Sequence, residues 1–353
     1  MAGFSSGLDL SLGFYTDVVR PLLDDALPGV PHSAALLGTG SEILGFDTAR
    51  STDHDWGPRL QVFLPNAHRH AERITALLTE RLPVTWHGYP TAFTRTHDPD
   101  PTRRHRVEVT DLGDWLRTWL GFDPRADVTV TDWLATPTQR LAEVTGGAVF
   151  HDGLGELEPA RAALAWYPDD VWVFVLACQW HRIAEEEAFP GRCAEVGDDL
   201  GATVVTARLV RDLMRLCLLM DRRYPPYAKW LGTAFARLPA LDDLPTHLAG
   251  ALTAEDWPTR ERHLVAAYQA VAARHNELGR TEPLATTTRP FHDRPFQVLA
   301  ANRFTNALLA TIDRPDLRDR PLTGAVDQFL DSVDALGDLR FTRRALRHRA
   351  SRR

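Results

Sequence analysis

The spacing of apolar residues changes near His151, and this change limits the folds that are open to the chain. Before it, short β-type runs alternate with turns and short helical stretches. The pattern predicts strands at residues 31–37, 59–64, 84–87, 106–110 and 148–150, and helices at residues 7–23, 68–81 and 112–120. Short strands mixed with helices are typical of an α+β domain, in which a small mixed sheet is flanked by helices.

After His151 the pattern is helical. Apolar residues recur at helical spacing over residues 169–187, 197–221, 226–237 and 254–278, and a polar, Pro-punctuated loop at 280–295 precedes a last helix at 295–310. We therefore expect an α+β domain at residues 1–152, a helical bundle at 153–339 and a basic tail at 340–353.

Charge is unevenly distributed along the chain. The 353 residues include 40 basic and 47 acidic ones, a net charge of −7. Residues 340–353 contain seven arginines and no acid, so the rest has 33 basic and 47 acidic residues, a net charge of −14. A basic arm can bind nucleic acid, but a frayed helix with a solvated tail is the simpler interpretation. Nucleic acid is therefore not the expected partner.

The composition argues against a P-loop, a cysteine-based site and a membrane-spanning segment. The single lysine is Lys229, so the Gly-Lys pair of a P-loop does not occur. Three widely spaced cysteines cannot form a disulfide framework or a Cys-rich zinc site. The longest uncharged apolar run, residues 171–178, is far shorter than the ~20 residues that cross a bilayer. We expect a cytoplasmic protein without a membrane partner.

The stretch at residues 37–45 predicts a phosphate-binding element. Gly40 and Ser41 follow an apolar strand at the expected start of a helix. Glycine permits close backbone approach, and free N–H groups with the Ser41 hydroxyl can bind phosphate oxygens.

Asp53 and Asp55 predict a magnesium site. They stand two residues apart at the expected start of the strand at 59–64, so both carboxylates would point from one face. Mg²⁺ prefers such hard oxygen ligands. Glu108, between two valines of a later strand, supplies a third carboxylate, with Asp111 and Asp114 as alternatives that could instead start the next helix. Three carboxylates can hold two metal ions for in-line phosphoryl transfer.

Gly40-Ser41, Asp53-x-Asp55 and Glu108, in this order, resemble the signature of the nucleotidyltransferase superfamily, which includes DNA polymerase beta and the bacterial aminoglycoside and lincosamide adenylyltransferases. That signature is a Gly-Ser pair after a strand, an Asp-x-Asp pair on the next strand and a lone acid on a later one. His54 departs from it, because an apolar residue is usual there.

The chain also resembles an uncharacterised bacterial family, domain of unknown function 4037, in which such a domain is joined to a helical one. Three stretches carry this resemblance, at residues 51–59, 224–232 and 294–298. It covers nearly everything except the basic tail and implies no substrate.

The superfamily resemblance implies a magnesium-dependent nucleotidyltransferase. It would move a nucleoside monophosphate, with ATP as the expected donor, to an acceptor hydroxyl with release of pyrophosphate. The resemblance does not identify the acceptor. The alternative is a non-catalytic regulatory protein that binds a nucleotide or a partner with a degenerate version of the fold. The residues implied in nucleotide binding are Gly40, Ser41 and Arg59, and those implied in catalysis and metal binding are Asp53, Asp55 and Glu108.

Two features of the helical part carry open hypotheses. Lys229, with Tyr227, could reach the nucleotide triphosphate, or it could be a surface lysine. His181 and Glu185 share a helix face with Gln179 and Arg182 nearby, and could either present a general base to the acceptor or form a polar network that closes the domain interface.

Overall fold

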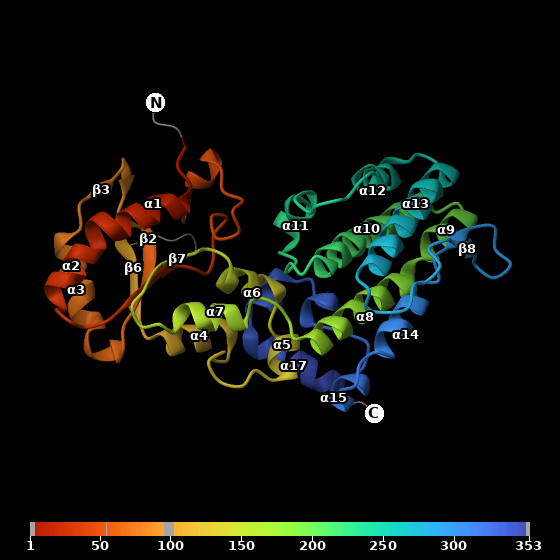
Figure 1. The fold of residues 1–353 in the computed structure, drawn as a ribbon. Coiled ribbons are helices and arrows are strands. Elements are labelled where there is room, and N and C mark those ends of the chain that lie inside the picture. Colours follow the sequence, from red (N-terminus) through yellow and green to blue (C-terminus); the bar gives the residue numbers. More distant parts are fainter. Residues whose placement is uncertain (1–3, 54, 95–101, 351–353) are drawn as a thin grey trace. The chain divides into compact units, whose positions relative to one another are not determined.

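The computed structural model describes residues 4–53, 55–94 and 102–350 (Figure 1). It has an α+β fold, as predicted. The chain divides into two compact units. The sheet unit comprises Met1–Val128 and Arg140–Ala165, and the helical unit comprises Thr129–Gln139 and Trp166–Arg353. Across the described residues, none of the helices combines the length and apolar character that a membrane span requires.

The unit boundary differs from the predicted boundary at residue 152. Residues 129–139 contain helix α5 (Val130–Ala135), and they pack within the helical unit. Trp133 on α5 is buried and meets the Tyr167 ring edge-on, with ring centroids 5.5 Å apart. This contact between distant parts of the sequence, which local periodicity cannot predict, places residues 129–139 in the helical unit.

The sheet unit is built on five strands in the order β5-β6-β2-β1-β7. β2 is parallel to β6, and the other neighbours are antiparallel. The five strands are β1 (Ser33–Leu36), β2 (Arg59–Phe63), β5 (Ala92–Phe93), β6 (Arg104–Thr110) and β7 (Ala148–Asp152). Its other elements are helices α1 (Gly7–Phe14), α2 (Arg20–Ala26), α3 (Ala71–Arg81), α4 (Leu112–Leu120) and α7 (Leu157–Ala163), the π-helix η1 (Tyr15–Val19), the 3-10 helices η2 (Ala49–Asp53) and η3 (Ala67–Arg69), and the hairpin of β3 (Thr85–Trp86) and β4 (Tyr89–Pro90).

Helices α1 to α3 cover one face of this sheet. Leu60, Val62 and Val107 point into a core that includes Phe14 on α1 and Ile74 on α3. Side chains alternate along a strand, so Arg59, Gln61 and Phe63 point to the opposite face. There the Trp115 ring of α4 packs edge-on against Phe63, with centroids 5.8 Å apart.

The helical unit is organised around α8 (Asp169–Glu186), which is buried along most of its length. As predicted, it begins directly after Pro168, with Asp169 and Asp170 in its first turn. Trp172 donates to the Leu219 carbonyl at 2.8 Å, and Trp180 stacks on Phe304. The other helices are α9 (Phe189–Glu195), α10 (Asp199–Met220), α11 (Ala228–Ala236), α12 (Leu244–Thr253), α13 (Trp257–Glu277), α14 (Asn302–Leu309), α15 (Pro315–Arg318), α16 (Val333–Gly337) and α17 (Leu339–Ala350), with the 3-10 helix η4 (Val326–Gln328) and the short strands β8 (Arg289–Pro290) and β9 (Gln297–Val298).

Two predictions for the C-terminal part are wrong. The helix expected at 295–310 is shorter, as α14, and is followed by α15 to α17. Residues from 340 on were expected to form a frayed helix with a solvated tail, but they form helix α17, in which Thr342 and Leu346 are buried. Arg343 pairs with Asp132 at 2.7 Å. Burial alone would raise the pKa of Asp132, but hydrogen bonds from Thr129 and the pair with Arg343 lower it below its usual range.

Acid should destabilise the helical unit through His275. Its Nδ1 accepts a hydrogen bond from Trp180 Nε1 at 3.2 Å, and burial lowers its pKa from 6.5 to about 4. The unfolded chain takes up this proton first, so stability is present above pH 6.5 and is lost as the pH falls towards 4. We expect His275→Gln to reduce the loss of unfolding free energy between pH 7 and pH 4 by up to about 3 kcal/mol, measured by urea unfolding.

The matched control for this prediction is His181→Gln. His181 lies on α8 with its side chain 36% exposed, so its replacement removes a histidine without opening the core. If the wild type and His275→Gln lost the same unfolding free energy between pH 7 and pH 4, the assignment of this pH dependence to His275 would be contradicted.

Candidate functional site

Three segments of the sheet unit meet at one end of its sheet. β1 is antiparallel to β2, with Ala35 opposite Gln61, so β1 ends beside the start of β2. β6 is parallel to β2, with Arg106 opposite Arg59, so it starts at that same end. The turn after β1, the loop before β2 and the first residues of β6 therefore lie together. We call this place the site end.

A buried ion pair shapes the turn after β1. Arg59 Nε donates to Glu42 Oε1 at 3.0 Å, and Arg59 Nη2 donates to Glu42 and to the Thr39 carbonyl. Gly40 has a φ of 138°, and a Cβ there would collide with both Arg59 and Glu42. Glycine is therefore required. Arg59, predicted to bind the nucleotide, is bonded here to the turn itself.

The helix expected at Gly40-Ser41 is absent. Residues 41–45 form hydrogen-bonded turns, in which Phe46 N–H donates to the Ser41 carbonyl. Backbone groups of this segment bond to α6 (Thr138–Thr145) and the residues after it. Gly38 N–H donates to the Glu143 carbonyl, and Gly147 N–H donates to the Ile43 carbonyl. Thr39 and Gly40 are exposed and Ser41 is half-buried, so a ligand can reach the turn.

The aspartate pair precedes β2 and does not start it. Asp53 ends η2, and its side chain, with all of His54, lies outside the described residues. Asp55 is half-buried in a loop with a φ of 52°, and β2 begins only at Arg59. The prediction that strand alternation aligns the two carboxylates is therefore wrong.

Packing of the next residues explains this loop. Trp56 is buried and donates its indole N–H to Asp47 at 3.2 Å, which fixes the chain beside Asp55. Gly57 has a φ of 148°, and a Cβ there would meet the Phe93 ring at 3.3 Å. Pro58 has no N–H group, so it cannot donate a hydrogen bond to a neighbouring strand, and β2 begins at the next residue.

Glu108 lies on the strand next to β2, as predicted. It is opposite Gln61, and it is exposed while Val107 is buried. Asp111 caps α4, accepting from Gly113 N–H at 2.8 Å, and Asp114 pairs with Arg117. Both follow the far end of β6, away from the site end, so of the three acids Glu108 is nearest to it.

The donor set suits magnesium by its chemistry, since Asp55 and Glu108 offer hard carboxylate oxygens near the site end. No group of three or more His, Cys, Asp or Glu side chains suited to a metal ion is found within residues 4–53, 55–94 and 102–350. The Asp53 side chain is not among the parts described. Metal binding by Asp53, Asp55 and Glu108 stays a prediction.

Tyr227 and Lys229 belong to the helical unit. Tyr227 N–H donates to Gln139 Oε1 at 3.1 Å, directly before α11. Lys229 is exposed, with Nζ 5.0 Å from the centroid of the Trp230 ring. Their contact with a nucleotide stays a prediction.

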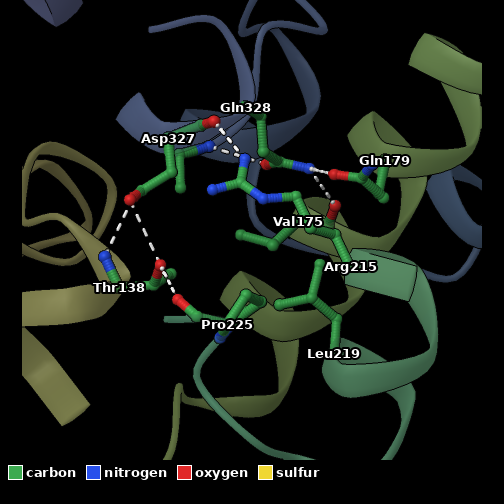
Figure 2. Close-up of a pocket in the computed structure, with 9 residues that line it drawn as sticks. Thr138, Val175, Gln179, Arg215, Leu219, Pro225, Asp327 and Gln328 are labelled. Carbon is green, nitrogen blue, oxygen red and sulfur yellow. Dashed lines mark hydrogen bonds between the residues drawn. The ribbon is translucent and has the colours of Figure 1, made fainter. Parts of the chain in front are cut away.

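Gln179 takes part in a buried polar network of the helical unit (Figure 2). Its Oε1 accepts from Gln328 Nε2 at 3.0 Å, and its Nε2 donates to the Asp212 carbonyl at 3.1 Å. Asp327, in the same network, accepts from Thr138 N–H at 2.9 Å. Burial raises the pKa of Asp327, although Arg215 and Thr138 oppose this. Gln179 therefore belongs to a polar network inside the helical unit, and the closing of the domain interface by this group stays a prediction.

The remaining members of that predicted group differ in role. Arg182 bonds to Asp212 at 3.3 Å, so it also serves the interior of the unit. His181 Nε2 lies 3.7 Å from Glu185 Oε1, as their spacing predicts, and both side chains are accessible.

Sequence reasoning missed three residues that build the site end. Glu42 neutralises Arg59, Gln61 accepts from Leu37 N–H at 3.0 Å, and Trp119 packs beside Gly38. An acid directly after Gly-Ser and a polar residue inside an apolar strand were the available signals for the first two.

One family model matches part of the chain. Residues 133–231 match the family model of DUF4037, a domain of unknown function. The resemblance predicted from the sequence is thereby confirmed over this segment. The DUF4037 segment contains Tyr227 and Lys229, while the stretches at 51–59 and 294–298 lie outside it. No curated protein matches the chain.

Among solved structures, a nucleotidyltransferase-like protein from Exiguobacterium sibiricum matches at 13% sequence identity with a TM-score of 0.35. The match covers 86% of this chain and 89% of that one.

Proposed function

We propose that the protein is a magnesium-dependent nucleotidyltransferase that uses ATP. The observation that carries this proposal is the meeting of three segments at the site end: the Gly40-Ser41 turn, the Asp55 loop and the strand with Glu108. They follow one another along the chain in the order of the superfamily signature described above.

Each segment has a role in the proposed reaction. The N–H groups of the turn and the Ser41 hydroxyl bind phosphate oxygens of the nucleotide. Asp53, Asp55 and Glu108 would hold Mg²⁺, which when bound neutralises charge on the triphosphate. Glu108 Oε accepts the acceptor's proton. The acceptor oxygen forms a bond to the α-phosphorus, and the bond to pyrophosphate breaks.

Rigid support favours catalysis at this place. The Arg59–Glu42 pair and the Trp56–Asp47 hydrogen bond fix the turn and the loop from inside the unit. Transfers of this type depend on positioning and charge neutralisation, which need a fixed scaffold.

Calorimetry with ATP, with and without Mg²⁺, tests the proposal against the regulatory alternative. We expect ATP binding to require Mg²⁺, because the carboxylates near the nucleotide repel its phosphates unless a cation lies between them. Binding that is indifferent to Mg²⁺ would favour a non-catalytic nucleotide sensor.

A further inference from the structure

Two histidines of the helical unit face each other across the helix pair α12 and α13. The two helices are joined by residues 254–256 and pack side by side (Figure 1). His247 lies on α12 and His263 on α13, with their Nδ1 atoms 3.3 Å apart and their ring centroids 5.5 Å apart. Both residues are half-buried, so a small ion can reach the rings from solvent.

The His263 ring is held in place by a glycine of the other helix. A Cβ at Gly250 would lie 2.5 to 2.6 Å from three atoms of this ring, closer than packed atoms approach each other. The ring therefore lies on the backbone of α12, about one turn after His247. Arg260, one turn before His263 on α13, is buried and donates to the Ala251 carbonyl at 3.2 Å, which ties the two helices together.

The distance between the two nitrogens suits a transition-metal ion. Zn²⁺ binds histidine nitrogens at about 2.0–2.1 Å in a tetrahedral arrangement, which places two of them about 3.3 Å apart. In the absence of a metal, one Nδ1 has to carry a proton and donate it to the other. Neutral imidazole is a good ligand for Zn²⁺, Cu²⁺ and Ni²⁺, whereas Mg²⁺ prefers oxygen ligands. The pair therefore has the spacing and the chemistry of two ligands on one metal ion.

We propose that His247 and His263 form a binding site for a divalent transition metal such as Zn²⁺, which joins α12 to α13. Each ring contributes its Nδ1. No group of three or more such ligands occurs among the described residues, so water completes the coordination. The inference goes beyond the proposed function, because both histidines belong to the helical unit and the carboxylates of the site end belong to the sheet unit.

Calorimetric titration with Zn²⁺ tests the site. The full chain, without an affinity tag, is freed of metal with a chelator and titrated in excess Mg²⁺, which competes for carboxylates but not for imidazoles. We expect a site for one Zn²⁺ per chain. His247→Gln and His263→Gln should each weaken binding at least tenfold, because a single imidazole remains. His68→Gln removes an exposed histidine of η3 and should have no effect.

A second pair of variants tests the site without removing a ligand. Gly250→Ala keeps both histidines, but its Cβ displaces the His263 ring, so Zn²⁺ binding should again weaken at least tenfold. Alanine favours a helix more than glycine does, so α12 is retained. Gly232→Ala on α11 is the matched control, because a Cβ there would meet only the Met214 methyl group, at 3.9 Å. Its Zn²⁺ binding should equal that of the wild type.

Thermal unfolding adds a measurement that does not depend on calorimetry. Zn²⁺ should raise the unfolding temperature of the wild type, since a ligand of the folded state stabilises it, and should not raise that of His247→Gln/His263→Gln. The site is wrong if the wild type does not bind Zn²⁺, or if either single histidine variant binds it as tightly as the wild type. These measurements use no ATP, so their outcome is separate from that of the proposed transfer reaction.

Discussion

Asp55→Asn is expected to lower nucleotidyl transfer by about a hundredfold to a thousandfold, because a metal-binding carboxylate contributes several kcal/mol to the transition state. Asparagine is the appropriate replacement. Asp55 has a φ of 52°, in the left-handed region that asparagine also tolerates, so the backbone of the loop is retained. The initial rate of labelled transfer from ATP measures the effect, and thermal unfolding shows that the fold is intact.

Two further variants complete this experiment. Asp53→Asn should lower the rate by a similar factor. Asp25→Asn changes an exposed carboxylate on α2 and should leave the rate unchanged. An Asp55→Asn protein that unfolds would show that the aspartate is structural, and one with the wild-type rate would remove it from the site.

Glu42→Ala should destabilise the sheet unit by about 3–5 kcal/mol, because it leaves the Arg59 guanidinium buried without its counter-charge. Both side chains of the pair are less than 10% exposed. Urea unfolding monitored by tryptophan fluorescence measures the loss. Asp24→Ala provides the control, since it breaks the exposed Arg20–Asp24 pair of α2 and should cost about 1 kcal/mol or less.

A double variant keeps this prediction testable if Glu42→Ala does not fold. Glu42→Leu/Arg59→Met removes both charges, and should be more stable than Glu42→Ala because no unpaired ion remains. Equal instability of the two proteins would mean that the turn depends on packing alone.

The central strands were predictable because β2 is buried at every position and β6 alternates between buried and more exposed residues. β2 and β6 fall within a residue or two of their expected bounds, and α4 has the predicted bounds. The alternation of Val107 and Glu108 in the sequence also agrees with the structure, in which Val107 is buried and Glu108 is exposed. Here local pattern and tertiary packing demand the same arrangement.

The conformations within the site end could not be predicted in this way. The Gly40-Ser41 segment turns because it bonds to residues around α6, a hundred positions later in the chain. The loop at Asp55 is set by Trp56, which is anchored on Asp47. Such contacts between distant segments leave no periodic signal in the sequence.

The segment 129–139 illustrates the same limit. Its helix α5 begins with a capping box, in which Thr129 and Asp132 bond to each other's backbone N–H, and this Thr-x-x-Asp pattern was available in the sequence. Its assignment to the helical unit depends on burial of Trp133 near Tyr167, which only the folded chain reveals.

Transfer of the α-phosphate label tests the central claim most directly. The wild-type chain is incubated with Mg²⁺, cell extract and ATP labelled either at the α- or at the γ-phosphate. We predict a stable labelled product from α-labelled ATP only, with release of pyrophosphate, and no product when Mg²⁺ is omitted or Asp55→Asn is used. Binding of ATP without any labelled product, and without dependence on Mg²⁺, would contradict the claim.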